Sequence, residues 1–278
     1  MPTLRVARRL TLPALGALLT AVVLAGCADT VSPTDTVSPT GKTQADRVTP
    51  PELGACHALE PADVEKPSDA SKPVSCSEDH TAETFAIGTF PDRYASASYD
   101  DAALGRFVFD TCGKAYRTFL GADESETMRS LLSWAWFRPS EQAWKEKARW
   151  YRCDVVGGPA GASAYRTLPR TLKGFMSARP DEDWTLCARG PKVAGSTKVP
   201  CSTKHDWRAV TTIKLGQAGD AYPGDRIAQI RSQQYCSDSV GAWLNYPATN
   251  YDYGVTVFHE AEWKAGNRRS ICWARTDT

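Results

Sequence analysis

The chain of 278 residues carries 33 Lys and Arg against 32 Asp and Glu, which gives a net charge of +1 at neutral pH. A near-neutral chain lacks the concentrated basic face that phosphate binding requires, so nucleic acid is not an expected partner. After the N-terminal segment no hydrophobic run approaches about 18 residues, so the sequence predicts no transmembrane helix.

Residues 1–26 have the character of a lipoprotein signal peptide. Arg5, Arg8 and Arg9 precede an apolar run from Leu10 to Leu24 that is too short to span a bilayer. The run ends in LAGC, residues 24–27, which resembles the lipobox of bacterial lipoproteins, where the signal is cut before a cysteine that is then diacylated. An ordinary secretory signal with a chance cysteine is the alternative. The Arg8-Arg9 pair leaves both Sec and twin-arginine export open.

Cleavage before Cys27 would leave 30 basic and 32 acidic side chains, so the mature chain would also be close to neutral. Two acyl chains, such as palmitate, on one cysteine suffice for stable anchoring. We therefore expect lipidation at Cys27 and a position on the extracytoplasmic face of the cell membrane. The segment 28–50 contains TVSPT twice and few hydrophobic side chains, so residues 27–50 are predicted to form a disordered tether.

The eight remaining cysteines indicate an internal repeat. They fall into two sets of four, at positions 56, 76, 112 and 153 and at positions 187, 201, 236 and 272. The stretch VSCSEDH, which contains Cys76 and His80, is echoed 125 residues later by VPCSTKH, which contains Cys201 and His205. The sequence therefore predicts a first module at 51–157, a connector at 158–181 and a second module at 182–278.

The end of each predicted module repeats a tryptophan and an arginine in the same frame. Trp144 and Trp263 each lie nine residues before the last cysteine of their set. Arg149 and Arg268 each follow that tryptophan by five residues. Together with His80 and His205, these residues form a structural motif that the two modules share.

Each module is expected to contain one helix and a small antiparallel sheet. The apolar spacing in 100–121 predicts a helix with Asp100 as N-cap and Gly121 as its end, and 223–245 is the weaker counterpart. Short β-branched or aromatic runs predict strands at 84–90, 131–137 and 148–156 and at 209–215, 251–258 and 269–274. The predicted fold class is α+β, with two tandem disulfide-stapled modules.

An exported chain with four cysteines per module is expected to use them as disulfides. Four cysteines allow three connectivities. The interval between the first and second cysteine varies most, 20 residues against 14, and a bridge across it would confine that change to its own loop. This favours first-to-second and third-to-fourth pairing, namely Cys56–Cys76, Cys112–Cys153, Cys187–Cys201 and Cys236–Cys272.

Zinc is the alternative use of these cysteines, because Cys76 and His80, and Cys201 and His205, have a spacing that could supply two ligands. No CxxC occurs in either module, and export favours oxidised thiols. We therefore expect no metal and no cofactor.

His80 and Glu83 are the strongest candidates for catalytic residues, since the two lie three positions apart. The stretch runs into a predicted strand, in which residues three apart point to opposite faces. The second module has Arg208 in place of the glutamate. A structural hydrogen bond at each histidine is therefore the favoured reading, and no recognisable catalytic motif occurs in the chain.

The tryptophans are also open to two readings. Trp134 and Trp136 share a strand face with Leu132, which is more typical of a core than of a ligand platform. If a strand begins at Trp144, lysines 145 and 147 would alternate with it on an edge strand, where they could meet an anionic polymer or headgroup but would more commonly protect the edge.

The pattern VxCSxxHxxE, a helix cysteine and a late W-x4-R-x3-C resembles the septum formation domain of actinobacterial envelope proteins, and LPRTLKG at 168–174 is similar to the join in two-domain members. This resemblance implies an envelope location and a part in cell division, with no defined reaction. We expect a non-catalytic lipoprotein that binds an envelope protein or wall polymer, or serves as a scaffold for a secreted partner. The alternative is a cell-wall-modifying enzyme with a nonstandard site around His80 and Glu83.

Overall fold

The computed structural model describes residues 41–178, 181–247 and 250–276, so the predicted signal peptide, Cys27 and the tether up to residue 40 lie outside the described residues. The first sheet is antiparallel and has the order β1-β2-β4-β3, with β1 Cys56–His57, β2 Ala82–Thr89, β3 Ser133–Phe137 and β4 Trp150–Val156. The second sheet has the order β6-β5-β7-β9-β8, with β5 Leu186–Arg189, β6 Thr197–Pro200, β7 Trp207–Lys214, β8 Tyr253–Thr256 and β9 Arg269–Arg275. The predicted α+β class is confirmed.

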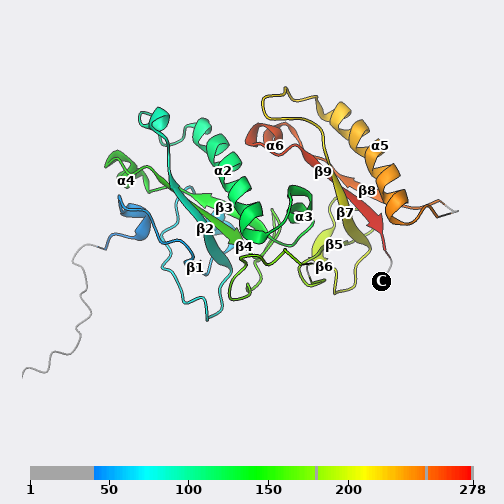
Figure 1. Cartoon of the computed structure of the whole chain (residues 1–278), viewed down its shortest axis with the longest axis horizontal. Helices are drawn as coiled ribbons and strands as arrows, with labels where there is room; N and C mark the ends of the chain where they lie inside the picture. Colours follow the sequence, from blue (N-terminus) through cyan, green and yellow to red (C-terminus); the bar gives the residue numbers. More distant parts are fainter. Residues whose placement is uncertain (1–40, 179–180, 248–249, 277–278) are drawn as a thin grey trace, which may run out of the picture. The chain divides into compact units, whose positions relative to one another are not determined.

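One long helix accompanies each sheet: α2 Ala102–Leu120 lies across the first and α5 Asp225–Trp243 across the second (Figure 1). Asp101, one residue after the expected Asp100, caps α2 by accepting a hydrogen bond from the Ala103 amide. Gly121 ends the helix with φ 75°, a left-handed conformation that favours glycine. The shorter elements are the α-helices α1 Pro61–Val64, α3 Glu124–Met128, α4 Glu141–Lys145 and α6 Glu260–Ala265 and the 3-10 helices η1 Gln44–Asp46 and η2 Asp92–Tyr94.

The two sheets share an irregularity at the same place in the frame. The pairing of β2 with β4 shifts between Thr84 and Ala86, and the pairing of β7 with β9 shifts between Ala209 and Thr211. These positions are 125 residues apart, as are the two CSxxH stretches. The repeat therefore extends to a bulge, a backbone feature with no signature in the side chains.

The described chain is ordered before residue 51, which differs from the predicted tether. Ala45 is buried, and its carbonyl accepts a hydrogen bond from the Ser140 amide. The indole of Trp150 donates to the carbonyl of Arg47. Residues 43–48 thus cover the end of the first module, because one small side chain and two backbone carbonyls suffice to seat a segment that is otherwise polar.

The predicted connector is also packed where it is described. Leu168, Leu172 and Met176 are buried in the same apolar cluster as the inner face of α2. The amide of Leu168 donates to the carbonyl of His80, and the amide of Met176 donates to that of Leu120. Residues 168–176 are therefore a part of the first module.

The strand considered at Trp144 is wrong. Residues 141–145 form α4, in which Ser140 caps the helix by accepting from the Ala143 amide. Lys147 follows with φ 72°, and β4 begins only at Trp150. The lysines therefore lie on a helix and a turn, and they do not protect a strand edge.

The largest buried cluster joins the two modules. It combines residues of α2, such as Leu104 and Val108, with Trp207, Ala209 and Trp273 of the second sheet. Arg269 on β9 donates to Glu124 on α3 over 2.7 Å, which adds an ion pair between the modules. Among the described helices, none is long and apolar enough to cross a membrane.

Candidate functional site

The four disulfides hold the repeated frame in place. They join Cys56 to Cys76, Cys112 to Cys153, Cys187 to Cys201 and Cys236 to Cys272, which are the pairs that the interval argument favours. In each module one bridge links the long helix to the central strand of the sheet, and the other closes the loop before the CSxxH turn. Each bridge closes within a single module.

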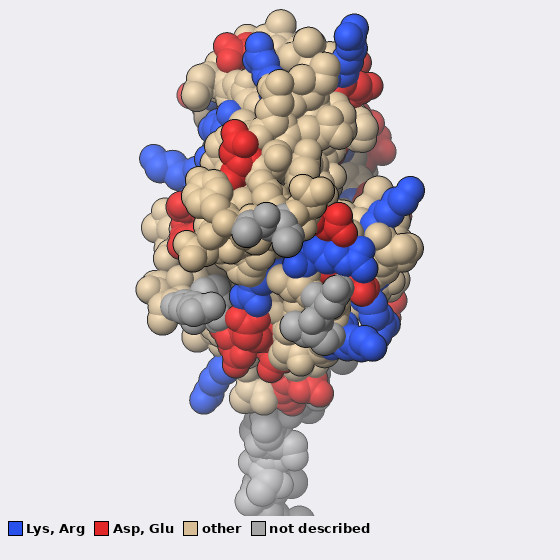
Figure 2. All heavy atoms as spheres, turned by 90° about the vertical axis from the view of Figure 1, so that its right-hand side faces the viewer, with Lys and Arg blue, Asp and Glu red and all other residues tan. Residues whose placement is uncertain are grey.

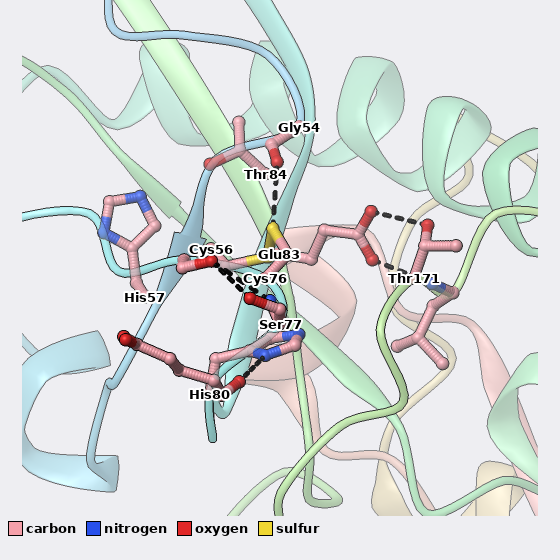
Figure 3. Close-up of a disulfide and its surroundings, with 12 residues drawn as sticks. Gly54, Cys56, His57, Cys76, Ser77, His80, Glu83, Thr84 and Thr171 are labelled. Carbon is pink, nitrogen blue, oxygen red and sulfur yellow. Dashed lines mark hydrogen bonds between the residues drawn. A yellow bond between two sulfur atoms is a disulfide. The ribbon is translucent and has the colours of Figure 1, made fainter.

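The repeated histidines make the same local contact. Nδ1 of His80 lies 2.8 Å from the carbonyl of Glu78, and Nδ1 of His205 lies 2.7 Å from the carbonyl of Thr203. A carbonyl can only accept, so Nδ1 carries the proton in both rings. Both side chains are buried. Each ring therefore fixes the backbone of the turn that leads from the disulfide into the next strand (Figure 3).

Glu83, the other half of the catalytic candidate, anchors the connector. Glu83 is buried, with 5% of the residue exposed. Its carboxylate accepts hydrogen bonds from the Thr171 hydroxyl and the Leu172 amide, each at 2.8 Å. Figure 3 shows this carboxylate directed toward Thr171, away from His80. His80 lies in the turn before β2 and Glu83 lies on that strand, so the alternation of residues along a strand does not apply to the pair; the two are separated because the Glu83 carboxylate turns to the connector.

Arg208 occupies the place of Glu83 in the second module and makes a contact of opposite polarity. Its guanidinium forms two hydrogen bonds with the carboxylate of Glu182, at 2.6 and 2.8 Å. Residues 171–172 lie in the predicted connector, and Glu182 is the first residue after it. The same motif position therefore holds a residue of the 171–182 stretch in both copies, although the charge is reversed.

The repeated tryptophan and arginine form a second pair of matching contacts. The indole of Trp144 donates to the carbonyl of Ala97, and the indole of Trp263 donates to that of Asp220. The guanidinium carbon of Arg149 lies 3.9 Å from the centre of the Trp144 ring, and the corresponding distance for Arg268 and Trp263 is 4.8 Å. The indole hydrogen bonds fasten a short helix to the loop before the long helix, and the cation–π contacts hold each tryptophan against its arginine.

One group of potential metal ligands occurs among the described residues: Cys187, Cys201 and His205, whose ligand atoms lie within 4.8 Å of one another. The two sulfurs are joined in a disulfide and offer no thiolate, which is the form that binds zinc. In this oxidised state the group does not suit a zinc ion.

A buried polar network on the first sheet escaped the sequence argument. Arg152 on β4 lies 2.7 Å from carboxylate oxygens of both Asp69 and Asp154, and Asp154 accepts from the Thr84 hydroxyl. His57 lies beside it, with Nδ1 3.3 Å from the Ser71 hydroxyl. Burial, followed by the charge of Arg152, lowers the pKa of His57.

This network has no counterpart in the second sheet. In the frame of the central-strand cysteines, Arg152 and Asp154 correspond to Ile271 and Trp273. Neither Arg152 nor His57 belongs to the repeated motif, so repetition could not identify them. The available signal was the pair Arg152 and Asp154 within the otherwise uncharged run of β4, since charged residues are almost never fully buried unless they are paired.

A surface cleft of about 1140 Å³ contains the second copy of the motif. Its lining includes Cys201, His205, Arg208 and Trp243. Glu182 and Arg208, which both line it, form an ion pair. The lining also contains Glu126, Arg129 and Lys204, so the cleft combines motif residues with further charged side chains.

The outer face of α5 carries exposed apolar side chains. Ile227 and Ile230 have exposures of 39% each and lie on the side of the helix away from the buried Ala228 and Cys236. Figure 2 looks at the second-module end of the molecule, where Lys and Arg alternate with Asp and Glu across a largely uncharged surface. On this side neither sign of charge dominates the surface.

The described residues thus define a disulfide-stapled tandem α+β protein whose repeated motif residues make structural contacts. The model of one family, described as septum formation, matches residues 24–138 and again residues 53–272. The chain belongs to this septum formation family, and the membership supports an envelope role connected with the septum and cell division. Neither a curated protein nor a solved structure matches the chain.

Proposed function

We propose that the protein is a membrane-anchored envelope lipoprotein that acts in septum formation by binding an envelope protein, without catalysis. The observation that carries this proposal is the use of His80 and Glu83. The proton on Nδ1 of His80 goes to a backbone carbonyl, and both carboxylate oxygens of Glu83 accept from the connector. A general acid or base must have a free position within reach of substrate. Nε2 of His80 has no hydrogen-bond partner among the described residues but is buried, and the His80 and Glu83 side chains are only 2% and 5% exposed.

The second module supports the same proposal. The catalytic alternative requires an acid at the third position after the histidine, and this module has Arg208 there, paired with Glu182. Both modules nevertheless keep the disulfide, the histidine contact and the tryptophan–arginine contact. The two modules thus share structural contacts and do not share a candidate catalytic pair, which suits a binding protein.

Membrane attachment rests on the sequence LAGC at residues 24–27. The described residues begin at 41, so residues 28–40 would link them to acylated Cys27. An anchored module on a short tether is held at high local concentration near the membrane, which favours a partner on the same surface.

The surface proposed to meet that partner is the outer face of α5. Isolated exposed apolar residues are common, but Ile227 and Ile230 are neighbours on one face of α5. The helix α2 packs against both modules, whereas α5 is covered on one side only. A wall polymer rich in hydroxyl and charged groups would match this apolar face less well than an envelope protein would.

Photo-crosslinking in dividing cells tests this proposal. A crosslinking residue at Ile227 should give a discrete protein adduct that depends on septation, whereas the same residue at exposed Lys114 on α2 serves as the matched control. Release of soluble fragments from purified peptidoglycan by the purified protein would favour the enzyme instead. An adduct with glycan alone would indicate that the partner is a wall polymer and not a protein.

A further inference from the structure

A cavity of about 540 Å³ lies between the two modules, which is within the range of sites for small molecules. One wall comes from α2 and β3, with Phe109, Tyr116, Trp134 and Trp136. The other wall comes from the second sheet, with Lys198, Ile271 and Trp273. None of the residues in the repeated histidine motif lines it, so the cavity is separate from the site described above.

The second wall is apolar because the two sheets have diverged on this face. In the first sheet the corresponding face carries Arg152 and Asp154, and it is covered by the buried Asp69 and Leu59 of the segment before β2. In the second sheet the equivalent residues are Ile271 and Trp273, and the cavity is left in front of them. The first module covers this face of its sheet with its own chain. In the second module the same face is apolar and is partly open to the cavity.

Lys198 on β6 brings a positive charge to this wall. Its Nζ lies 4.4 Å from the centre of the Trp273 ring. Burial lowers the pKa of Lys198, and among the described residues it forms no ion pair with a carboxylate. Of the other charged residues that line the cavity, Arg269 is paired with Glu124, Glu262 accepts from the His259 amide, and Arg117 lies on the opposite wall. A partly buried cation without an acid is costly unless something anionic meets it.

Tyr116 contributes a second unsatisfied group from the opposite wall. The side chain is 4% exposed, and its hydroxyl makes no hydrogen bond of normal geometry among the described residues. Burial raises the pKa of this hydroxyl, and the neighbouring Ser130 opposes that effect only in part. The hydroxyl therefore remains a proton donor at neutral pH, and it lines the cavity without a fixed acceptor.

We propose that this cavity binds an amphipathic anion: a lipid-like molecule whose apolar part lies along the aromatic walls and whose single carboxylate or phosphate pairs with Lys198. The Tyr116 hydroxyl donates a hydrogen bond to a polar oxygen of the ligand. This inference goes beyond the proposed function, because it needs neither the α5 surface nor a septal partner.

Isothermal titration calorimetry on the full chain bearing Cys27→Ser, which removes its own lipidation site, tests the proposal. Dodecanoate and dodecyl phosphate are the anionic probes, dodecanol is the neutral probe and dodecylammonium is the cationic probe, each below its micelle concentration. We expect the anions to bind at least about 10-fold more tightly than dodecanol, the effect of one charge-assisted contact, and dodecylammonium to bind most weakly. Tighter binding of dodecanoate would indicate a fatty acid, and tighter binding of dodecyl phosphate would indicate a phosphorylated lipid.

Four variants locate the binding. Lys198→Met should weaken both anions about 10-fold and leave dodecanol unchanged, whereas Lys198→Arg should retain anion binding. Tyr116→Phe should weaken the anions while raising the melting temperature, because it removes a buried hydroxyl without a partner. Gly113→Leu places a side chain in the cavity, where a Cβ would meet only the guanidinium of Arg117 at 3.6 Å, and should block every probe.

Three results would overturn the proposal: equal affinity for dodecanol and the anions, failure of every probe to bind, or anion binding that survives Gly113→Leu. The last result also covers the case in which Lys198→Met does not fold, since Gly113 lies on α2 and its replacement favours the helix.

Discussion

Replacing Glu83 with alanine should loosen the connector and destabilise the first module. The carboxylate accepts one hydrogen bond from the buried Leu172 amide and one from the more exposed Thr171 hydroxyl. A hydrogen bond to a charged group contributes about 1.5–3 kcal/mol, and the hydroxyl can turn to water when the acceptor is lost. The Leu172 amide would stay buried without a partner, so we expect a total loss of about 2–3 kcal/mol. For an ordered unit of this size that is a fall in melting temperature of about 4–12 °C.

Arg208→Ala is the matched control, because the same motif position in the second module holds its own inter-module contact. The side chains of Arg208 and Glu182 are 20% and 40% exposed, so solvent screens their pair. A pair of this kind contributes at most about 1 kcal/mol, which corresponds to a shift below about 4 °C. The two substitutions should therefore differ clearly, although they change equivalent positions.

Circular dichroism melting and limited trypsin digestion measure the two consequences. Arg170 and Lys173 flank the anchored residues and are exposed, so trypsin should cut there faster once the connector is released. Glu83→Ala should accelerate these cuts, and Arg208→Ala should not. If Glu83→Ala melts within about 2 °C of the unmodified protein and resists trypsin equally, burial of the connector leucines alone holds the segment and the anchoring argument is wrong.

Three further predictions address other residues. His80→Ala and His205→Ala should each lower the free energy of unfolding by about 1–3 kcal/mol in denaturant titrations, whereas a catalytic role predicts a stable, inactive His80→Ala protein and no effect at His205. Because the pKa of His57 is lowered in the folded chain, the unfolded chain binds a proton below about pH 6.5 that the folded chain does not bind. The free energy of unfolding should therefore fall with acid by up to about 1.4 kcal/mol per pH unit. His57→Gln should remove this slope, and an unchanged slope in that variant would contradict the prediction. Cys27→Ser should move the protein from the membrane pellet to the soluble fraction, and sedimentation with membranes after a high-salt wash would exclude anchoring at this residue.

The cysteine frame made much of the fold predictable. The two sets of four cysteines differ most in the interval between the first and second cysteine, and this difference favours one disulfide pairing. The two long helices follow from apolar spacing, and Gly121 marks the end of the first. The strands β1, β5 and β6 were missed because two to four residues are too few to show a period. The helix at Trp144 was read as a strand for a similar reason, although Ser140 before it is a favourable N-cap.

The contacts of the candidate site were less predictable, because they join residues that are distant in the chain. Glu83 accepts from the Leu172 amide 89 residues later, and Arg152 donates to Asp69 across 83 residues. No local pattern specifies such pairs. From the sequence we expected strand geometry to keep Glu83 away from His80, but His80 lies before β2, and only the fold reveals that Glu83 faces the connector.

The shared core bears on whether the repeat consists of two independent folding units. Each module has its own sheet, long helix and two disulfides, so a cut near residue 165 should on sequence grounds give two stable halves. That cut would remove buried Leu168, Leu172 and Met176 from the module on which they pack, and would leave Glu83 without its connector. We therefore expect residues 42–178 to melt cooperatively and residues 42–165 to melt much lower or not at all. Residues 182–278 should bind a dye for exposed apolar surface, because Trp273 loses its cover. If two halves cut at residue 165 both melt like the intact protein, the common core is not needed for the stability of either module, and the expectation is wrong.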